Sequence, residues 1–332
     1  MNILVTGAAG YIGSVVTERL IDQGHQVVAL DNLRHGHREA LHPQARFLEG
    51  DLLDRPWLID QVRRAGVDAV VHLAAEALID ESIRDPGTFF RVNVTGGLNL
   101  LDAMAAAGVR RLIFSSTAAV YGEPRQIPIP EDAPLQPVNA YGESKLAFER
   151  ALPWFQRAHG LRHVSLRYFN ACGATARTGE RHEPETHLIP ILLDVALGRR
   201  EAIHLFGTDY DTPDGSCIRD YVHVLDIADA HLRCLERIDT IEPTVFNLGN
   251  GHGYSNREVI AAVERVTGRP VRAIPAARRP GDPARLVASA GRIAQELDWR
   301  PGHPGLDAMI SSAWAWHRSI AAGQLPAAEL GR

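Results

Sequence analysis

The stretch VTGAAGYIGS, residues 5–14, decides the fold. Its three glycines, Gly7, Gly10 and Gly13, stand three residues apart and directly follow the apolar run at 3–5. Glycine permits a tight turn and lets a ligand or another backbone approach closely. A strand, a glycine turn and a helix N-terminus together direct free N–H groups and the positive end of a helix dipole at one point. The stretch therefore predicts a strand-to-helix corner that binds a dinucleotide pyrophosphate, with a corner that binds nothing as the alternative.

The first half of the chain alternates apolar runs with helical patterns. Strands are expected at 3–5, 26–30, 45–49, 69–73, 111–115 and 163–167, and helices at 14–23, 55–65, 89–108 and 142–158. Near-continuous apolar strands that alternate with helices are typical of a parallel sheet covered on both faces. The sequence therefore predicts an α/β fold with a doubly wound, Rossmann-type parallel sheet.

After about residue 170 the alternation becomes irregular. Residues 171–185 are small and polar, helices are expected at 188–198 and 256–267, strands at 202–206 and 244–250, and RRPGDPAR is expected to be a loop. We predict a dinucleotide-binding domain at 1–170 and a smaller substrate domain at 171–332.

The composition excludes several classes of function. The 332 residues carry a formal net charge of -5, with no polycationic region that would indicate nucleic-acid binding. Three widely spaced cysteines fit a reducing cytoplasm without disulfides. The chain opens into a strand rather than a signal peptide, and no apolar run is long enough to cross a membrane. No metal site is predicted from the 15 histidines.

An acidic residue at the end of the second strand selects the cofactor. Asp31 lies 18 residues after Gly13, where a carboxylate accepts hydrogen bonds from the adenosine ribose and repels a 2′-phosphate. NAD is therefore predicted rather than NADP, and a solvated turn acid is the alternative. Asp51 and Leu52, after the third strand, are expected to bound the adenine, although Asp51 is equally suited to capping a turn.

Tyr141 and Lys145 share one helix face because they are four residues apart. A free tyrosine, with a pKa near 10, is a poor base at neutral pH. A nearby ammonium and a positively charged nicotinamide both favour the phenolate and lower that pKa. Tyr141 is thus a candidate base for a substrate hydroxyl that Thr117 holds by a hydrogen bond. A pair on a helix surface is the alternative.

These features resemble the extended short-chain dehydrogenase/reductases. The shared elements are the glycine triplet, Asp31, LAA at 73–75, Asn93, SST at 115–117 and YxxxK at 141–145. GAAGYIGS, SSTAAVYG, LRYFNACGA, LFGTDYDTPDGSCIRDYVHV, FNLGNGHGYS and RRPGD narrow the resemblance to the UDP-glucose 4-epimerases, also called UDP-galactose 4-epimerases. The resemblance covers essentially the whole chain, and the long block around Arg219 is its most specific part.

The resemblance implies an NAD site and a UDP-sugar site. The NAD site is implied at Gly7, Gly10, Tyr11, Ile12, Gly13, Asp31, Asn32, Asp51, Leu52, Leu73, Ala74, Ala75, Asn93, Ser115, Tyr141, Lys145 and Phe169. The UDP-sugar site is implied at Thr117, Tyr141, Asn170, His187, Leu188, Phe206, Arg219, Arg279, Asp282 and Leu286. Arginine suits a pyrophosphate because its guanidinium group stays charged and binds two oxygens at once. Surface salt bridges are the alternative for Arg219 and Arg279.

Three positions bear on specificity. Many members carry a lysine near the nicotinamide ribose where this chain has Ala77, so that contact is missing. His187 stands where an asparagine is often found beside the uracil or the diphosphate. Leu286, four residues after Asp282, stands where the family sets the room around the sugar C2 substituent. A leucine there predicts a preference for UDP-glucose and UDP-galactose over N-acetylated sugars, and simple packing under the loop is the alternative.

The implied reaction is reversible epimerisation at C4 of a UDP-hexose through a 4-keto sugar, with tightly bound NAD that is regenerated in each cycle. Other nucleotide-sugar epimerases, dehydratases and decarboxylases of the superfamily are alternatives; those that act at C5 or C6 place an acid directly after the Ser/Thr, where this chain has Ala118 and Ala119. A non-enzymatic NAD-sensing regulator is an alternative of a different class, and such proteins typically lack the Tyr or the Lys of YxxxK.

The resemblance also implies how chains and domains meet. It predicts a homodimer through the helices at 89–108 and 142–158, with Leu98, Leu101, Met104, Leu146 and Phe148 as candidate contacts unless these residues belong to the core of one chain. It further implies that pieces near 219–250 return to the first domain.

Overall fold

The computed structural model describes residues 1–279 and 281–323. Pro280 of the RRPGD motif and residues 324–332 of the predicted second domain lie outside the described residues.

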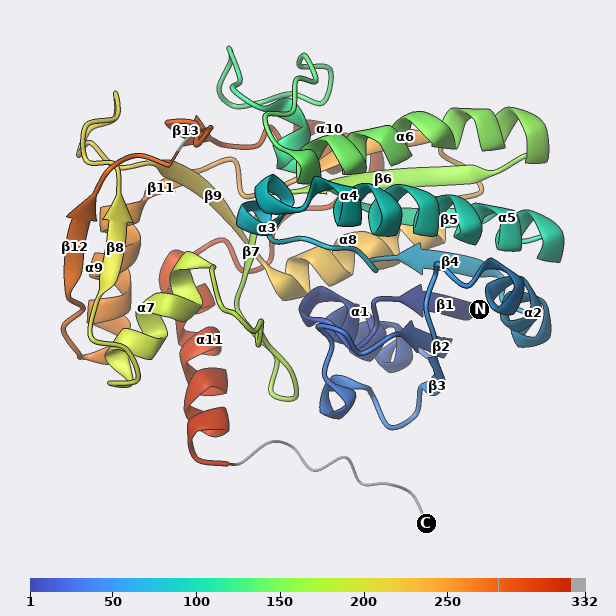
Figure 1. Cartoon of the computed structure of the whole chain (residues 1–332), viewed down its shortest axis with the longest axis horizontal. Coiled ribbons are helices and arrows are strands. Elements are labelled where there is room, and N and C mark those ends of the chain that lie inside the picture. The colour runs from blue at the N-terminus through green and yellow to red at the C-terminus, as the bar shows by residue number, and fades with distance from the viewer. Residues whose placement is uncertain (280, 324–332) are drawn as a thin grey trace.

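A seven-stranded parallel sheet is the centre of the larger part of the molecule (Figure 1). In sheet order its strands are β10 (Thr244–Leu248), β6 (Arg162–Tyr168), β5 (Arg111–Thr117), β4 (Ala69–His72), β1 (Asn2–Thr6), β2 (Gln26–Asp31) and β3 (Arg46–Glu49). Helices α1 (Tyr11–Asp22) and α8 (Val224–Arg237) cover one face, and α2 (Arg55–Ala65), α5 (Gly97–Ala107) and α6 (Ala140–His159) cover the other. The predicted doubly wound α/β fold is confirmed.

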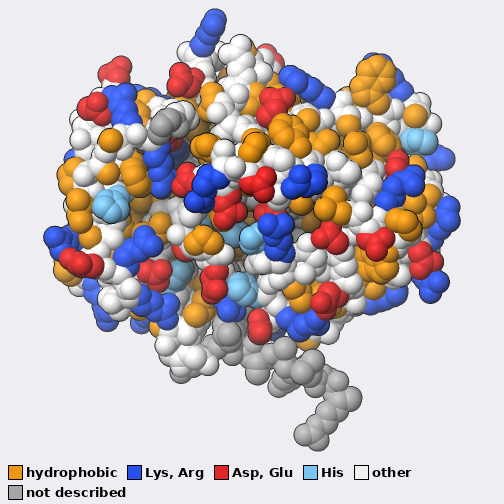
Figure 2. All heavy atoms as spheres, viewed as in Figure 1, with side chains coloured by type: hydrophobic (Ala, Val, Ile, Leu, Met, Phe, Trp, Pro, Cys, Tyr) orange, Lys and Arg blue, Asp and Glu red, His pale blue; other side chains and the backbone are white. Residues whose placement is uncertain are grey.

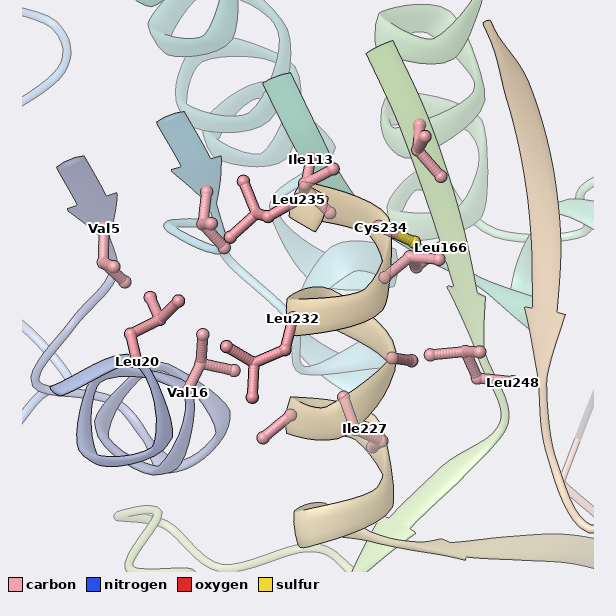
Figure 3. Close-up of a cluster of buried hydrophobic side chains, with 14 of the residues drawn as sticks. Val5, Val16, Leu20, Ile113, Leu166, Ile227, Leu232, Cys234, Leu235 and Leu248 are labelled. Atoms are coloured by element: carbon pink, nitrogen blue, oxygen red, sulfur yellow. The ribbon is translucent and has the colours of Figure 1, made fainter. Parts of the chain in front are cut away.

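Apolar side chains hold these layers together. Figure 3 shows Val5 of β1 and Ile113 of β5 facing Leu20 of α1 and Leu232 of α8. All four are buried or nearly so. Burying one such side chain stabilises the fold by about 1.5–3 kcal/mol, so continuous apolar strands favour helices on both faces.

The smaller part of the molecule contains two small sheets and a helical cluster. β9 (Ile218–His223) pairs with β7 (Asn170–Cys172), β11 (Gly253–Ser255) and β13 (Arg285–Leu286), and β8 (Ile203–Phe206) pairs with β12 (Ala273–Ala276). Helices α7 (Leu188–Ala196), α9 (Asn256–Thr267) and α11 (Leu306–Ala321) pack around one apolar core. Short helices are α3 (Ile79–Arg84), α4 (Pro86–Phe89) and α10 (Gly291–Leu297).

The chain passes between the two parts more than once. β10 pairs with β6 at the edge of the large sheet, and α8 packs on α1, although both follow residue 200. β9, which directly precedes α8, belongs to the smaller sheet instead. The site at the end of the large sheet is therefore built from both halves of the sequence.

The predicted helix at 89–108 is wrong as a single α-helix. The segment contains the end of α4, a π-helical stretch at Phe90–Gly96, and α5. Such wide turns occur often at functional sites. The helix predicted at 142–158 starts earlier, because the Asn139 side chain caps it by accepting from the Gly142 N–H at 2.8 Å, and it ends at the left-handed Gly160.

Two short strands occur where the sequence predicted irregular structure. β7 (Asn170–Cys172) overlaps the start of the segment predicted as irregular at 171–185, and β13 falls at the end of RRPGDPAR; both gain their hydrogen bonds from β9, a partner distant in sequence. Among the described helices, none combines the length and apolar character needed to cross a membrane.

Candidate functional site

The glycine turn after β1 is required by packing. Gly7 has a φ of +71°, and a Cβ there would lie 2.6 Å from the Ala74 nitrogen. A Cβ on Gly13 would lie 2.0 Å from the Gly7 oxygen. Gly10 is the N-cap of α1 and offers no side-chain cap to its free N–H groups. The corner thus requires glycine at 7 and 13, and it leaves an uncapped helix N-terminus suited to an anion.

A cavity of about 800 Å³ opens at the carboxyl ends of the parallel strands. This is where open α/β sheets bind their ligands. Of the residues predicted at the two sites, all line this cavity except Asn93. The structure therefore brings the predicted NAD residues and the predicted UDP-sugar residues into one continuous space.

Asp31 is held in a fixed orientation at the dinucleotide end of the cavity. Its Oδ2 accepts from the Ala9 N–H at 2.9 Å and its Oδ1 from the Leu33 N–H at 2.8 Å. Burial raises the pKa of this carboxyl group. Each oxygen keeps a second lone pair, so the carboxylate can accept from ribose hydroxyls, as an NAD site requires.

Asn32 and Asp51 meet beside this carboxylate. The Asn32 amide donates to Asp51 Oδ2 at 2.9 Å, while Asp51 Oδ1 accepts from the Leu53 N–H at 2.8 Å. Asp51 thus caps a turn and lines the cavity at once, so the two expectations for it are compatible.

The candidate catalytic group lies at the start of α6 and the end of β5. Lys145 Nζ donates to the Ser115 carbonyl oxygen at 2.8 Å, and Thr117 Oγ1 accepts from the Ala119 N–H at 3.1 Å. Tyr141 lines the same wall of the cavity and packs edge-on against Phe89. One helix turn and one strand end thereby present a phenol, an ammonium and a hydroxyl to one region.

The pKa values in this group differ from the expectation. Burial raises the pKa of Tyr141, and only a hydrogen bond with Thr117 opposes that shift. Burial also lowers the pKa of Lys145 to about 7, against a smaller opposing effect of Glu149. In the protein alone, desolvation therefore outweighs the expected help of the ammonium to the phenolate. Positive charge from a bound cofactor is needed to favour the phenolate.

Asn93 acts beneath the cavity rather than in it. Its side chain accepts from the Glu76 N–H at 2.9 Å and donates to the Glu76 carbonyl oxygen at 3.0 Å and to Ser144 Oγ at 2.9 Å. The Ser144 hydroxyl donates to the Tyr141 carbonyl oxygen at 2.8 Å. Asn93 thus ties the loop after β4 to the helix that carries Tyr141, and the π-helical stretch directs it there.

A contact at the dinucleotide end of the cavity joins residues that no sequence pattern connects. Glu76, after β4, pairs with Arg34 at 3.1 Å and with His35 at 3.0 Å, both after β2. β1 lies between β4 and β2 in the sheet. We call Arg34, His35 and Glu76 the clasp, because they join the two loops that flank the glycine turn.

At the other end of the cavity, the predicted arginines have partners. Arg219 forms an ion pair with Asp282 and donates from Nη1 to the Ile218 carbonyl oxygen at 2.8 Å. The Arg279 guanidinium lies 4.2 Å from the centre of the Phe206 ring. Both arginines line the cavity, and Arg279 also forms an exposed ion pair with Asp80 at 4.0 Å, so each arginine combines an ion pair with a place in the cavity wall.

Leu286 and Ala77 also line the cavity. Leu286 is half-buried and packs against the cluster that contains Tyr121 and Phe169, so it both packs under the loop and faces the cavity. Asn170 begins β7, and Leu188 begins α7 directly after His187. Ala77 offers no polar atom, as the sequence indicated.

Comparison with known proteins decides the family. The protein-family model described as "NAD dependent epimerase/dehydratase family" matches residues 3–249 of this chain. The chain belongs to this family.

Relatives within the family match along nearly the whole chain. The UDP-glucose 4-epimerase of Streptococcus mutans is 49% identical over 328 residues, which cover 97% of this chain and 98% of the relative. The crystal structure of UDP-glucose 4-epimerase from Brucella ovis in complex with NAD has a TM-score of 0.92 and 42% identity, covering 95% of this chain and 98% of that one. That from Bifidobacterium longum in complex with NAD⁺ and UDP has a TM-score of 0.92 and 34% identity, covering 98% and 100%. The resemblance inferred from the sequence is confirmed.

Proposed function

We propose that this chain catalyses reversible epimerisation at C4 of a UDP-hexose, with UDP-glucose and UDP-galactose as its substrates and NAD as its bound cofactor. One observation carries the proposal: Tyr141, Lys145 and Thr117 line the same cavity as the glycine turn, Asp31 and the two arginines. Groups suited to a dinucleotide, to a sugar hydroxyl and to a diphosphate therefore share one space.

The residues present fit NAD. The uncapped N-terminus of α1 suits the pyrophosphate, and Asp31 suits the adenosine ribose. Arg34, near Asp31 in sequence, is paired with Glu76. NAD supplies reversible two-electron redox at the sugar carbon when bound.

The protein's own side chains handle the proton and the orientation. Tyr141 removes the proton of the 4-hydroxyl and returns it after the 4-keto sugar has turned over. The Thr117 hydroxyl holds the sugar oxygen, and the Lys145 ammonium stabilises the phenolate. Arg219 and Arg279 bind the diphosphate, so the sugar can turn while the nucleotide stays fixed.

The structure favours this reaction over dehydration. Ala118, the residue directly after Thr117, is buried, and Ala119 follows it in the same 3₁₀ turn. Neither offers an acid for work at C5 or C6. A non-enzymatic regulator is disfavoured because both Tyr141 and Lys145 line the cavity.

Product analysis tests the proposal. The protein as purified, without added NAD, is incubated with UDP-galactose, UDP-N-acetylgalactosamine or UDP-glucuronate, and the products are identified by NMR. We expect UDP-glucose from UDP-galactose. A dehydrated sugar would instead indicate the dehydratase, and unchanged substrate in a sample that contains NAD would indicate a regulator.

We also propose a homodimer, through other side chains than the sequence suggested. Leu101, Met104, Leu146 and Phe148 are buried in the core of one chain and cannot form an interface. Leu98 is half-buried and packs against that same core. Ile83, Phe90 and Trp154 remain exposed, and Figure 2 shows hydrophobic side chains among charged ones over this α3–α6 region. A monomer mass by light scattering at micromolar concentration would contradict the proposal.

The three cysteines are free and buried in the described structure. We propose that the protein works in a reducing compartment, the cytoplasm, where such thiols persist.

A further inference from the structure

The loop before α7 carries a repeated Glu-x-His pattern. Residues 180–187 read ERHEPETH, so that Glu180 and Glu185 each stand two residues before a histidine, His182 and His187. All four side chains line the cavity. We call these four residues the Glu-His quartet.

The quartet brings ligand atoms close together. One ligand atom each from Glu180, His182 and His187 lie within 4.8 Å of one another. His182 Nδ1 contacts the Glu180 carboxylate, and His187 Nδ1 lies 2.8 Å from Glu185 Oε1 and 4.0 Å from Glu180 Oε2. An ion bound by these atoms would lie about 2.0–2.2 Å from each of them.

Hydrogen bonds hold Glu180 of the quartet in place, whereas the two histidine side chains are more exposed. The Glu180 carbonyl oxygen accepts from Trp316 Nε1 at 3.2 Å, and Glu180 Oε1 accepts from the Arg181 N–H at 3.1 Å. The Glu180 side chain is 10% exposed, whereas those of His182 and His187 are 24% and 46% exposed. A carboxylate thus anchors the site, and the two imidazoles face the cavity.

Charge balance also points to a cation. Within residues 1–279 and 281–323, the ion-pair partners of Glu180 and Glu185 are His182 and His187, with no arginine among them. Two carboxylates and two imidazoles therefore stand together at the wall of the cavity. Such charges are costly unless protons or a metal ion compensate them.

We propose that Glu180, His182 and His187 bind one divalent transition-metal ion of the Zn²⁺ class, with Glu185 as a further oxygen ligand. Mixed imidazole and carboxylate donors suit Zn²⁺ or Co²⁺ better than Ca²⁺ or Mg²⁺, which prefer oxygen alone. His187 is also part of the predicted UDP-sugar site, but binding of the ion requires no substrate and can be measured whether or not the protein is an epimerase.

Calorimetric titration of the purified, NAD-containing protein with Zn²⁺ at pH 8 tests the site, because a higher pH reduces competition by protons. We expect one ion per chain. His182→Ala and His187→Ala should each weaken binding by about tenfold or more. His204→Ala is the matched control, since His204 lines the same cavity outside the quartet and should leave binding unchanged.

A Co²⁺ titration adds a readout of the ligands themselves. Stoichiometric Co²⁺ should give visible absorption bands that change in Glu180→Gln. If that variant does not fold, His187→Ala carries the test, because its side chain is the most exposed of the three. Less than one ion per chain, or equal Zn²⁺ affinity in wild type and both histidine variants, would overturn the proposal whatever the enzyme's activity.

Discussion

Lys145 Nζ donates to the Ser115 carbonyl oxygen at 2.8 Å, which ties α6 to the end of β5. Lys145 is 3% exposed. Lys145 is also the one lysine of the chain, since 34 of the 35 Lys and Arg residues are arginine. Arginine stays charged in proteins, whereas a buried lysine can shift its pKa toward neutrality. A position that needs an adjustable cation thus keeps lysine in a chain that otherwise uses arginine.

Replacing Lys145 should raise the free energy of unfolding. It should also lower the proposed epimerase activity, because the ammonium that stabilises the Tyr141 phenolate is lost. The pKa of Lys145 falls to about 7 in the folded protein from 10.5 in the unfolded chain. Below pH 7 the folded state bears the full cost of burying the charge, and that cost disappears as the pH rises from 7 to 10.5. After allowance for the lost hydrogen bond, Lys145→Met should gain on the order of 3 kcal/mol at pH 7.

Urea unfolding at pH 7 and pH 9.5, at equal NAD occupancy, measures this difference. The gain of Lys145→Met should shrink at the higher pH. If Lys145→Met raises the free energy of unfolding equally at pH 7 and pH 9.5, the lowered pKa of Lys145 is not the cause of the stabilisation. Lys145→Arg should be destabilised, because its charge cannot be lost.

Tyr141→Phe should lose about 10²–10⁴-fold in kcat while it keeps its NAD, because the phenol is the candidate base and general-base catalysis contributes this much. The ring still packs against Phe89, so the fold should persist. Turnover and the NAD content of a denatured extract are measured together. Near-normal turnover would assign the base elsewhere.

The clasp should retain NAD. Purified protein should carry NAD without addition, and Glu76→Gln should release it about tenfold faster, because the contacts of Glu76 with Arg34 and His35 weaken. Hydrogen bonding to Glu76 raises the pKa of His35, so that contact is complete below pH 6.5 and is lost as the pH rises through the raised value.

Release of NAD is followed by fluorescence at pH 6 and pH 8.5. Glu39→Gln is the matched control, since Glu39 lines the cavity but takes no part in the clasp. Equal release rates for both variants and the wild type would rule the clasp out as a retaining device.

Leu286 should set a graded preference against N-acetylated sugars. Apolar bulk discriminates by about 1–3 kcal/mol, so kcat/KM for UDP-galactose should exceed that for UDP-N-acetylgalactosamine by roughly ten- to a hundredfold. Leu286→Ala should narrow this ratio. Because Leu286 also packs beside Tyr121, the melting temperature is measured with it. Equal kcat/KM values for the two sugars in the wild type would show that Leu286 does not exclude the N-acetyl group.

Local patterns were sufficient for much of this protein. The glycines at 7 and 13 specified a corner that other residues cannot form, because a Cβ at either position would collide with backbone. The alternation of apolar strands and helices specified a parallel sheet, since such strands must be covered on both faces. The spacing of Tyr141 and Lys145 placed both on one face of α6, because helical geometry is local.

Contacts between distant segments were decided only by the tertiary structure. No local pattern could indicate that Glu76 meets Arg34 and His35, because that contact depends on β1 lying between β4 and β2. The pKa of Lys145 depends on burial, which arises only when α6 packs on the sheet. The sequence determined which side chains were present and how each segment folds, whereas their charge states and partners depended on long-range packing, which removes water and brings remote groups together.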